Sequence, residues 1–293
     1  MKKKRFLVIA YDKRQEYLRK MLCSAGHDVT FINETDKSGE YRKDNKTGKS
    51  YKFNTLNNLT DKIFDAILLP VSDSIRHYKR LYGCGIRAEN IFGCGISGAG
   101  AEPDINSCDA KDGIISGERR FIEYMESDAA AYANAVATAE GAVAQAVTLS
   151  DINLNMSNVL LAGFGRCGEI LANRLQAFNC NVTVLETDEG RRAKAGAYGY
   201  AYESDIAVIH DMKKYDFLFN TVPEKIFNSD ILQKFSKEIT IIDIASNPGG
   251  VDFDYCIEND IKACHALGLP GKFAPESSAK VLLEVIKKNM KIV

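Results

Sequence analysis

The chain has 293 residues, of which 38 are basic and 39 are acidic, so its formal net charge at pH 7 is -1. This balance, without a basic stripe interleaved with aromatic residues, argues against nucleic acid as a partner. The basic cluster at residues 2–5 is followed by only five apolar or small residues. That run is too short for a secretory signal or a membrane span, so we expect a cytoplasmic protein that does not enter a membrane.

Length and cysteine content narrow the class of protein further. A chain of this length is most simply two domains of about 120 to 150 residues each. The eight cysteines include no Cys-x-x-Cys pair, and only Cys264 lies beside a histidine, His265. Because two adjacent residues cannot easily bind one ion, we expect no metal site and reduced, mostly buried thiols.

The first domain is expected over residues 1–120. Apolar runs that alternate with helical stretches predict right-handed crossovers and a parallel, flavodoxin-like or Rossmann-like sheet. Strands are predicted at residues 5–10, 27–32, 64–70, 91–93 and 113–115, a helix at 15–25, and a polar loop or short hairpin at 35–60. The first turn carries no glycine fingerprint, so we expect this domain to hold substrate and not a dinucleotide.

Residues 121–149 are rich in alanine and predict a long helix that bridges the two domains. Asn134, Thr138 and Gly141 are three and four positions apart, so they share one helix face, with Glu140 on its flank. Small residues on that face would let another backbone or a ligand come close.

The second domain, residues 150–275, is organised around Gly-Phe-Gly-Arg-Cys-Gly at residues 163–168. A short apolar run, this motif and then apolar residues spaced three and four apart predict a strand, a tight turn and a helix that bind a dinucleotide. Gly163 is expected to form the turn, Gly165 to let the backbone approach a pyrophosphate, and Gly168 to let the helix lie close to the strand. The amides that open the helix would face the phosphates.

A strand predicted at residues 181–186 ends in a carboxylate, Glu186, 18 positions after Gly168. An acid at this place accepts hydrogen bonds from the ribose 2′-hydroxyl of NAD and would repel the 2′-phosphate of NADP. Arg191 and Arg192 are close enough in sequence to favour NADP instead, or they simply begin a solvated helix. Glu186 favours NAD, but the choice between NAD and NADP stays open.

Two more strands are predicted, at residues 216–220 and 239–245, and both end in polar residues. Since ligands of open parallel sheets bind beyond the carboxyl ends of the strands, we expect these ends to face the nicotinamide half of the cofactor. A strand and turn at 265–271 would follow, and a closing helix at 275–290, in the C-terminal segment 276–293, would pack back on the first domain. The expected cofactor-binding residues are Gly163, Phe164, Gly165, Arg166, Cys167, Gly168, Glu186, Thr187, Arg191, Asn220, Thr221, Val222, Pro223, Ala245 and Ser246.

These elements together predict an α/β fold with two doubly wound parallel sheets, both Rossmann-like, joined by a long bridging helix. This is the architecture of 2-hydroxyacid dehydrogenases.

The order and wording of several segments resemble the dipicolinate synthase A-subunit family, which acts in bacterial sporulation. The segments are Asp-x-Arg-Gln at 12–15, Ile-Leu-Leu-Pro-Val-Ser at 67–72, the helical segment 134–141, Gly-x-Gly-Arg at 163–166, Asn-Thr-Val-Pro at 220–223, Asp-Ile-Ala-Ser-x-Pro-Gly-Gly-x-Asp-Phe at 243–253, Gly-Leu-Pro-Gly at 268–271 and Ala-Pro at 274–275. They cover nearly the whole chain. The chain departs from the family at one place, where residues 186–188 read Glu-Thr-Asp and the family has an arginine suited to NADP.

The resemblance implies a reaction, a cofactor and a partner. A dihydro- or hydroxytetrahydro-dipicolinate from the lysine pathway would be oxidised to pyridine-2,6-dicarboxylate, and hydride would pass to NAD or NADP. The second component of dipicolinate synthase, a flavoprotein-like B-subunit, is implied as the partner, and the mother-cell cytoplasm during sporulation as the location. We also expect a homo-oligomer.

Aromatisation of the ring drives this chemistry, so the protein must mainly hold the ring against the nicotinamide and accept a proton. Glu140 is the expected proton acceptor. The candidate donors to the two substrate carboxylates are Arg14, Ser72, Asn134, Thr138 and the glycine-rich amides at 249–250 and 271. Each side chain also has a structural alternative, which is helix packing for Asn134 and Thr138, helix capping for Ser72, and a solvated surface for Arg14 and Glu140. His265 could lie near the site, but no catalytic histidine is assigned.

Two other functions stay open. A 2-hydroxyacid dehydrogenase needs an arginine to bind the substrate carboxylate and a histidine held by an acid. Residues 247–250 read Asn-Pro-Gly-Gly and supply no such arginine. The second alternative is a nucleotide-binding partner or sensor without turnover, which activity measured with and without the partner protein would distinguish.

Overall fold

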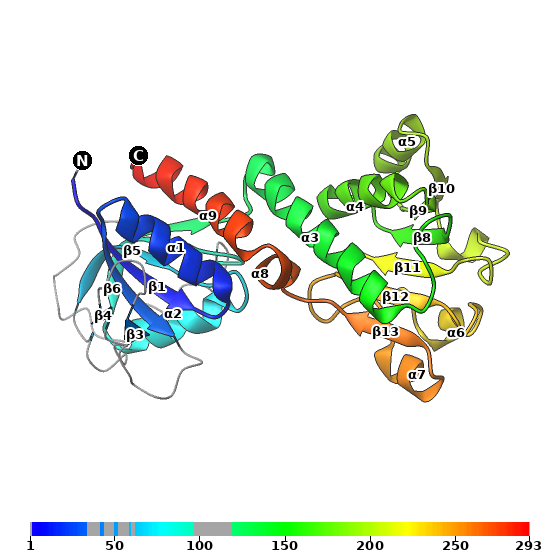
Figure 1. The fold of residues 1–293 in the computed structure, drawn as a ribbon, viewed down its shortest axis with the longest axis horizontal. Coiled ribbons are helices and arrows are strands. Elements are labelled where there is room, and N and C mark those ends of the chain that lie inside the picture. Colours follow the sequence, from blue (N-terminus) through cyan, green and yellow to red (C-terminus); the bar gives the residue numbers. More distant parts are fainter. Residues whose placement is uncertain are drawn as a thin grey trace. The chain divides into compact units, whose positions relative to one another are not determined.

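The computed structural model describes residues 2–33, 42–43, 50–51, 59, 62–96 and 119–292. Internal contacts divide the chain into two units (Figure 1). Unit 1 comprises Met1–Ala131 and Pro275–Val293, and unit 2 comprises Tyr132–Ala274.

Unit 1 is built on a five-stranded sheet in the order β2-β1-β5-β6-β7, and every neighbouring pair is parallel. The strands are β1 (Arg5–Ala10), β2 (Asp28–Asn33), β5 (Ile63–Leu68), β6 (Arg87–Gly93) and β7 (Arg120–Glu123). A separate antiparallel pair consists of β3 (Arg42–Lys43) and β4 (Ser50–Tyr51). With that pair left aside, the strand order is that of flavodoxin-like sheets.

Helices cover both faces of the unit 1 sheet, and β1 shows why. Its side chains alternate in direction, so Phe6 and Val8 pack into one core cluster while Leu7 and Ile9 pack into another. The first cluster lies under α1 (Lys13–Ser24) and α9 (Pro275–Met290), which run side by side in Figure 1, and the second lies under α2 (Ser74–Gly83). The C-terminal helix is therefore part of the first unit, and it has the bounds that the sequence predicted.

Unit 2 contains a six-stranded parallel sheet in the order β10-β9-β8-β11-β12-β13, the arrangement of dinucleotide-binding Rossmann domains. The strands are β8 (Asn158–Ala162), β9 (Asn181–Leu185), β10 (Ala201–Glu203), β11 (Phe217–Asn220), β12 (Thr240–Asp243) and β13 (Lys262–His265). The middle strands are buried on both faces, which explains their continuous apolar sequence.

Two core clusters lie on opposite faces of the unit 2 sheet. One gathers residues of α3 (Asp128–Leu149), α4 (Arg166–Ala177), α5 (Glu189–Ala197) and α8 (Leu269–Phe273). The other gathers residues near α6 (Ser229–Leu232) and α7 (Phe253–Glu258). The long helix α3 continues across the boundary between the two units in the chain.

Four sequence predictions about local structure need correction or lie outside the described residues. Residues 121–149 are not one helix, because Arg120–Glu123 pair with β6 as the last strand of unit 1. Residues 265–271 are not a strand and turn, because the strand ends at His265 and Leu269–Phe273 are helical. The strand predicted at 113–115 lies outside the described residues. Of the seven cysteines in the described part of the chain, none forms a disulfide, but only Cys180 and Cys256 are buried, so the expectation of mostly buried thiols is wrong.

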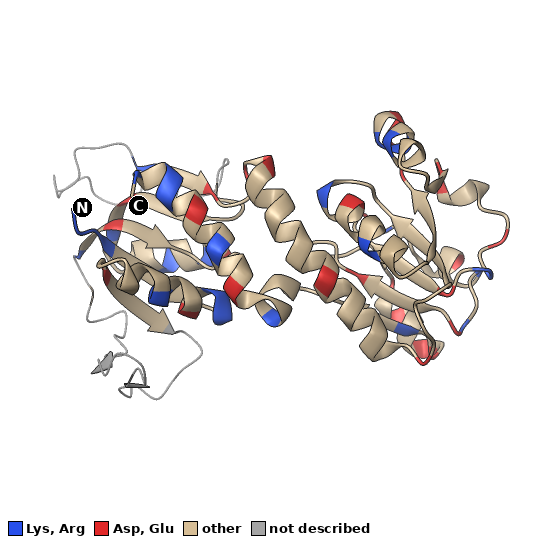
Figure 2. Cartoon of the chain, turned by 45° about the horizontal axis from the view of Figure 1, so that its top comes forward, with Lys and Arg blue, Asp and Glu red and all other residues tan. Residues whose placement is uncertain are grey.

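Basic and acidic residues both occur on the helices of each unit (Figure 2). Helix α3 carries few charges for its length, since only Asp128 and Glu140 are charged among its 22 residues. Within the described residues, no helix is both long enough and apolar enough to cross a membrane.

Candidate functional site

The glycine-rich loop joins β8 to α4, and its three glycines have three different environments. Gly163 has a φ of +88°, which favours glycine, and a Cβ there would lie 2.2 Å from the Thr221 hydroxyl. Gly165 is the N-cap of α4, and a Cβ there would meet no atom within 4 Å. A Cβ at Gly168 would lie 2.1 Å from the carbonyl oxygen of Gly163. The loop therefore turns at Gly163, leaves open space at Gly165, and packs the helix directly on the strand end at Gly168.

This loop lies where the strand order of the sheet reverses. β9 and β10 lie on one side of β8, and β11, β12 and β13 lie on the other. In open α/β sheets, ligands bind in the crevice beyond the carboxyl ends of the strands at such a point. The N-terminus of α4 opens at the same edge, where unpaired amides and the helix dipole favour an anion.

Arg166 and Cys167 begin α4. Arg166 is exposed, whereas Cys167 is half-buried. Burial raises the pKa of the Cys167 thiol, and the positive charge of Arg166 opposes this rise only in part. Cys167 is therefore a neutral thiol at physiological pH and not an activated nucleophile.

Glu186 follows β9 and is almost fully enclosed, with 7% of its surface exposed. Its Oε2 accepts a hydrogen bond from the Phe164 amide at 2.8 Å, and its Oε1 accepts one from the Asp188 amide at 3.0 Å. A guanidinium nitrogen of Arg191 lies 3.7 Å from Oε2. The acid predicted for the ribose position is thus also bound to the glycine-rich loop.

The two arginines of α5 have different surroundings. Arg192 donates to the carbonyl oxygens of Glu186 and Thr187, so it holds the turn that follows β9. Arg191 is 58% exposed at its side chain, and Thr187 is also exposed. Of the pair, Arg191 is therefore the one in a position to meet a phosphate from solvent.

The side chain of Phe164 anchors the glycine-rich loop to the sheet. It is 2% exposed and belongs to the core cluster beneath α3 and α4. Its ring meets the rings of Tyr198 and Tyr200 edge to face, with centroids 6.5 and 5.8 Å away. The loop residue between the first two glycines is therefore fixed by its side chain as well as by its amide.

The ends of β11 and β12 are tied to each other. Asp243 is fully buried, and its carboxylate accepts from the Ala245 amide at 2.9 Å, the Gly250 amide at 2.7 Å and the Asn220 side-chain amide at 2.9 Å. Asn220 is also fully buried. Its side-chain NH2 group donates to the Val222 carbonyl oxygen, and its side-chain oxygen accepts from the Val222 amide. The prediction that this strand end presents Asn220 to the nicotinamide is therefore wrong for its side chain, because all of its polar atoms brace the turn.

The other predicted residues at these strand ends differ in exposure. The Thr221 hydroxyl donates to the carbonyl oxygen of Ala162 at 3.0 Å, beside Gly163. Ala245 is buried, Val222 is half-buried, and Pro223 and Ser246 are exposed.

The motif that contains Pro-Gly-Gly closes over the same carboxylate. Gly249 has a φ of +84°, and a Cβ there would lie 2.8 Å from the Asp243 carboxylate. A Cβ at Gly250 would lie 2.5 Å from the Asn220 amide nitrogen. His265 is joined to the carbonyl oxygen of Ala245 at 2.8 Å, and its ring stacks on Phe253. Gly249, Gly250 and His265 therefore each have a structural role in this turn.

Helix α3 carries three of the residues expected to act on substrate. The Thr138 hydroxyl donates to the Asn134 carbonyl oxygen one turn earlier, at 3.1 Å, and both side chains are half-buried. Glu140 is exposed and lies 3.9 Å from Arg174, in the last turn of α4. Because the glycine-rich loop is at the first turn of α4, the structure places Glu140 toward the opposite end of that helix. It does not support Glu140 as the proton acceptor.

Gly141, on the same helix, lets α8 come close. A Cβ there would lie 2.9 Å from the Leu269 Cβ and 3.0 Å from the Phe273 ring. The sequence predicted that either another backbone or a ligand would come close to this face of small residues. The structure shows another helix there, α8.

A cluster around Glu169 was missed from the sequence. Glu169 lies in the first turn of α4 and accepts hydrogen bonds from Lys194 at 2.7 Å and from the Tyr132 hydroxyl at 2.9 Å. Burial alone would raise the pKa of Glu169, but these hydrogen bonds outweigh it and lower that pKa. The cluster ties α3, α4 and α5 together beside the loop. A lone glutamate after the glycine motif gave no signal for it, because its partners are 37 and 25 positions away.

In unit 1, Arg14 is buried, with 2% of its surface exposed, and it makes a bidentate ion pair with Asp12. Asp12 is also the N-cap of α1 and forms a capping box with Gln15. The interpretation of Arg14 as a surface charge is therefore wrong. The ion pair occupies Nε and one terminal nitrogen of the Arg14 guanidinium, and burial separates the side chain from solvent.

Ser72 lies half-buried in the turn after β5, at the carboxyl edge of the unit 1 sheet. It does not cap α2, because the N-cap is Asp73, whose φ is +55°. The neighbouring Ser74 was missed. Its hydroxyl donates to the Pro70 carbonyl oxygen at 2.5 Å and accepts from the Cys94 amide at 2.9 Å, which joins the turns after β5 and β6.

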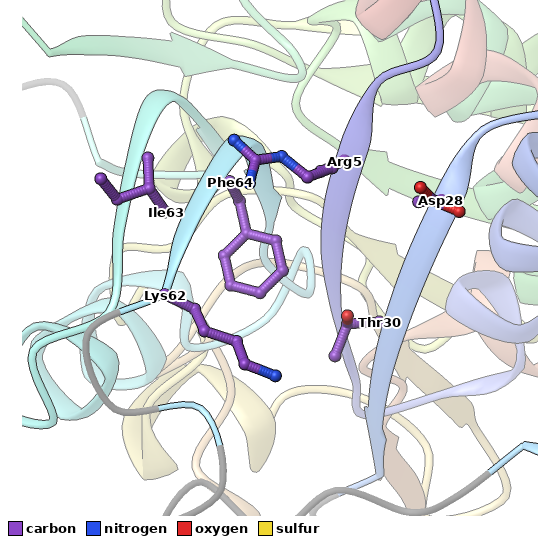
Figure 3. Close-up of a pocket in the computed structure, with 6 residues that line it drawn as sticks. All are labelled: Arg5, Asp28, Thr30, Lys62, Ile63 and Phe64. Atoms are coloured by element: carbon purple, nitrogen blue, oxygen red, sulfur yellow. The ribbon is translucent and has the colours of Figure 1, made fainter.

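Two cavities among the described residues lie away from these sites. One of 590 Å³ is lined by Arg5, Asp28, Thr30, Lys62, Ile63 and Phe64, at the amino ends of β1, β2 and β5 (Figure 3). The other, of 350 Å³, includes Asn158, Asn181 and Ala201, at the amino ends of β8, β9 and β10. Both are at the edge opposite the carboxyl ends of the strands, so neither is the dinucleotide site.

Comparison with known proteins agrees with this geometry. Residues 128–248 match the family described as the NAD binding domain of D-isomer specific 2-hydroxyacid dehydrogenases. The segment includes α3, the glycine-rich loop, Glu186 and the ends of β11 and β12. Unit 2 is thus similar to the NAD binding domain of these dehydrogenases, and its cofactor is NAD or NADP.

The predicted resemblance to the A-subunit of dipicolinate synthase is confirmed. That protein from Bacillus subtilis (strain 168) is 33% identical over 172 residues, and the match spans 58% of each chain. The crystal structure of the dipicolinate synthase A-subunit from Bacillus halodurans is 25% identical with a TM-score of 0.74, covering 98% of this chain and 97% of that one. D-lactate dehydrogenase from Escherichia coli is 13% identical, with a TM-score of 0.61 over 99% and 98% of the two chains, and so shares the fold. The predicted fold class is confirmed as well.

Proposed function

We propose that this chain is the nicotinamide-dependent dehydrogenase component of a dipicolinate synthase. In this role it oxidises dihydrodipicolinate to pyridine-2,6-dicarboxylate by loss of a hydride and a proton, or converts its hydroxytetrahydro precursor with the additional loss of water. The glycine-rich loop carries the proposal, because its turn, open space and close packing at Gly163, Gly165 and Gly168 are what a pyrophosphate site needs. The similarity to the A-subunit of dipicolinate synthase supplies the choice of substrate.

The proposed cofactor site extends along the carboxyl edge of the unit 2 sheet. Gly165 and the first amides of α4, with Arg166 and Cys167, would hold the pyrophosphate. Glu186 and Thr187, at the end of β9, would hold the adenosine ribose. The turns after β11 and β12 would hold the nicotinamide, through Thr221, Val222, Pro223, Ala245 and Ser246. When bound, the nicotinamide accepts the hydride.

The protein's own part in the reaction is to bind and orient the substrate. Two carboxylates of a ring need hydrogen-bond donors, and Asn134, Thr138 and Ser72 are the proposed donors that the structure leaves partly accessible. Arg14 is not among these donors, because it is buried and paired with Asp12, and Glu140 is not the proposed proton acceptor, because it lies beside the last turn of α4. Aromatisation of the ring supplies most of the driving force, so the demand on acid-base groups is small.

We propose that a second protein, the B-subunit of the synthase, takes part, since the named relatives are A-subunits. The chain itself is proposed to form a homo-oligomer. Neither partner surface is assigned to particular residues.

The test measures the formation of reduced NAD or NADP by the purified chain. Dihydrodipicolinate and D-2-hydroxyacids are offered as separate substrates, each in the presence and absence of the B-subunit. Turnover of dihydrodipicolinate without turnover of D-2-hydroxyacids supports the proposal. Turnover of D-2-hydroxyacids would instead favour a 2-hydroxyacid dehydrogenase, the activity that the matching family suggests. Cofactor binding without turnover under either condition would make the chain a nucleotide-binding partner and refute the proposal.

A further inference from the structure

Glu186 joins two turns that lie on either side of the proposed adenosine position. Oε2 accepts from the amide of Phe164, in the glycine-rich loop, at 2.8 Å. Oε1 accepts from the amide of Asp188, the N-cap of α5, at 3.0 Å. With only 7% of the residue exposed, these hydrogen bonds are shielded from competing water.

The loop side of this contact is packed into the core. The Phe164 ring is buried against Tyr198 and Tyr200, so the residue that donates to Glu186 cannot turn without leaving the core. Phe164 directly precedes Gly165, whose open face and helix-capping position make it the point of closest approach for a phosphate. The direction of the first α4 amides therefore depends on how Phe164 is held.

The other side of the contact is held equally firmly. Arg192 donates to the carbonyl oxygens of Glu186 and Thr187, which fixes the backbone that carries the carboxylate. Arg191 lies 3.7 Å from Oε2 and partly balances its charge. The carboxylate is thus a fixed anion between two turns.

We propose that Glu186 is a positioning residue for the phosphate-binding loop, in addition to lying at the ribose position. By holding the Phe164 amide, it presents Gly165 and the first α4 amides to the pyrophosphate. The inference rests on the proposed cofactor role of this loop. A residue that only reads the ribose would discriminate between NAD and NADP, whereas a residue that holds the loop is needed for both.

The variant Glu186→Gln separates these roles, because it keeps the shape of the side chain and removes its charge. The glutamine side-chain amide can adopt two orientations, and in each of them its NH2 group faces the backbone amide of either Phe164 or Asp188. One hydrogen bond is therefore lost, because two N–H donors face each other. We expect calorimetric titration to show NAD and NADP both binding about tenfold more weakly than to the wild type, which corresponds to about 1.4 kcal/mol. Glu189→Gln makes the same change at an exposed residue of the same turn and should leave both affinities unchanged.

Weaker NAD binding with unchanged or tighter NADP binding in Glu186→Gln would overturn the proposal, because loss of repulsion would then be the main effect. Failure of the wild type to bind either dinucleotide would refute the proposed function instead. If Glu186→Gln does not fold, amide hydrogen exchange of the cofactor-free wild type decides the question. A Phe164 amide that exchanges slowly supports the hydrogen bond to Glu186, and exchange at the rate of an exposed amide overturns it.

Discussion

Asp243 accepts three hydrogen bonds from three separate residues, and we expect Asp243→Asn to destabilise unit 2. The carboxylate is fully buried and holds the amides of Ala245, Gly250 and Asn220 at 2.9, 2.7 and 2.9 Å. Asparagine has the same shape but replaces one oxygen with an NH2 donor. At least one buried donor therefore loses its acceptor, and the remaining bonds lose the assistance of a negative charge.

The size of the effect follows from these contacts. A buried donor left without a partner costs about 1 to 3 kcal/mol. Charge-assisted hydrogen bonds are roughly twice as strong as neutral ones, so weakening the others adds about 1 kcal/mol. The free energy of unfolding of unit 2 should fall by about 2 to 4 kcal/mol, which corresponds to a decrease in Tm of about 5 to 15 °C for a unit of this size.

Thermal unfolding followed by calorimetry measures this loss. The transition of unit 2 is identified as the one that saturating NAD or NADP raises, because a ligand stabilises the state that binds it. Glu258→Gln, an exposed residue on α7, is the matched control for a carboxylate-to-amide change. If Asp243→Asn unfolds within about 0.5 kcal/mol of that control, the carboxylate does not hold these turns together.

Three further predictions follow from the described contacts. Gly168→Ala puts a Cβ 2.1 Å from the Gly163 carbonyl oxygen, so α4 must move by about 1 Å. Calorimetry should then show that NAD binds about 100-fold more weakly. An unchanged affinity would contradict the close packing. Gly141→Val overpacks the contact between α3 and α8, and urea unfolding should show a loss of about 1 to 3 kcal/mol, whereas a loss below about 0.5 kcal/mol would contradict it. Burial lowers the pKa of His27 from its ordinary value of 6.5, with Asp65 opposing and Lys4 adding to the shift. Below about pH 6.5 the unfolded chain binds a proton at His27 that the folded chain does not, so the free energy of unfolding of unit 1 should fall from pH 7 to pH 5. Urea unfolding of His27→Leu should show no such dependence on pH. An unaltered dependence would show that other groups cause it.

The α/β class and most strands could be predicted because parallel strands buried on both faces read as short apolar runs. The strand at Arg120–Glu123 was missed because its four residues include two charged ones and directly precede an alanine-rich helix. Such an edge strand has no strong pattern of its own, and its place is decided by pairing with β6, 30 positions earlier. The helix at Leu269–Phe273 was missed for a related reason, since Gly-Leu-Pro-Gly reads as a turn.

The glycine-rich loop was predictable to the level of single residues, because its three glycines stand at a fixed spacing within six positions and each has a known role in this type of turn. The environment of Arg14 was not, although its neighbours Asp12 and Gln15 spell a capping box. Its surroundings depend on residues distant in sequence, since its charge acts on Cys94 and Tyr124. Glu140 was misplaced because helical spacing gives the face of a helix but not which end of a neighbouring helix that face meets.

Two buried carboxylates of unit 2, Glu186 and Asp243, stand at strand ends and accept backbone amides from adjacent turns. In sequence, such residues look the same as residues that wait for a ligand. The hydrogen bonds of Asp243 account for much of the specific motif at residues 243–253, whose glycines fit closely around Asp243 and Asn220. Because both carboxylates shape the turns, we do not expect them to distinguish one substrate from another. We therefore expect the difference between a dipicolinate-forming enzyme and a 2-hydroxyacid dehydrogenase to reside in exposed side chains at the same edge, such as Pro223 and Ser246.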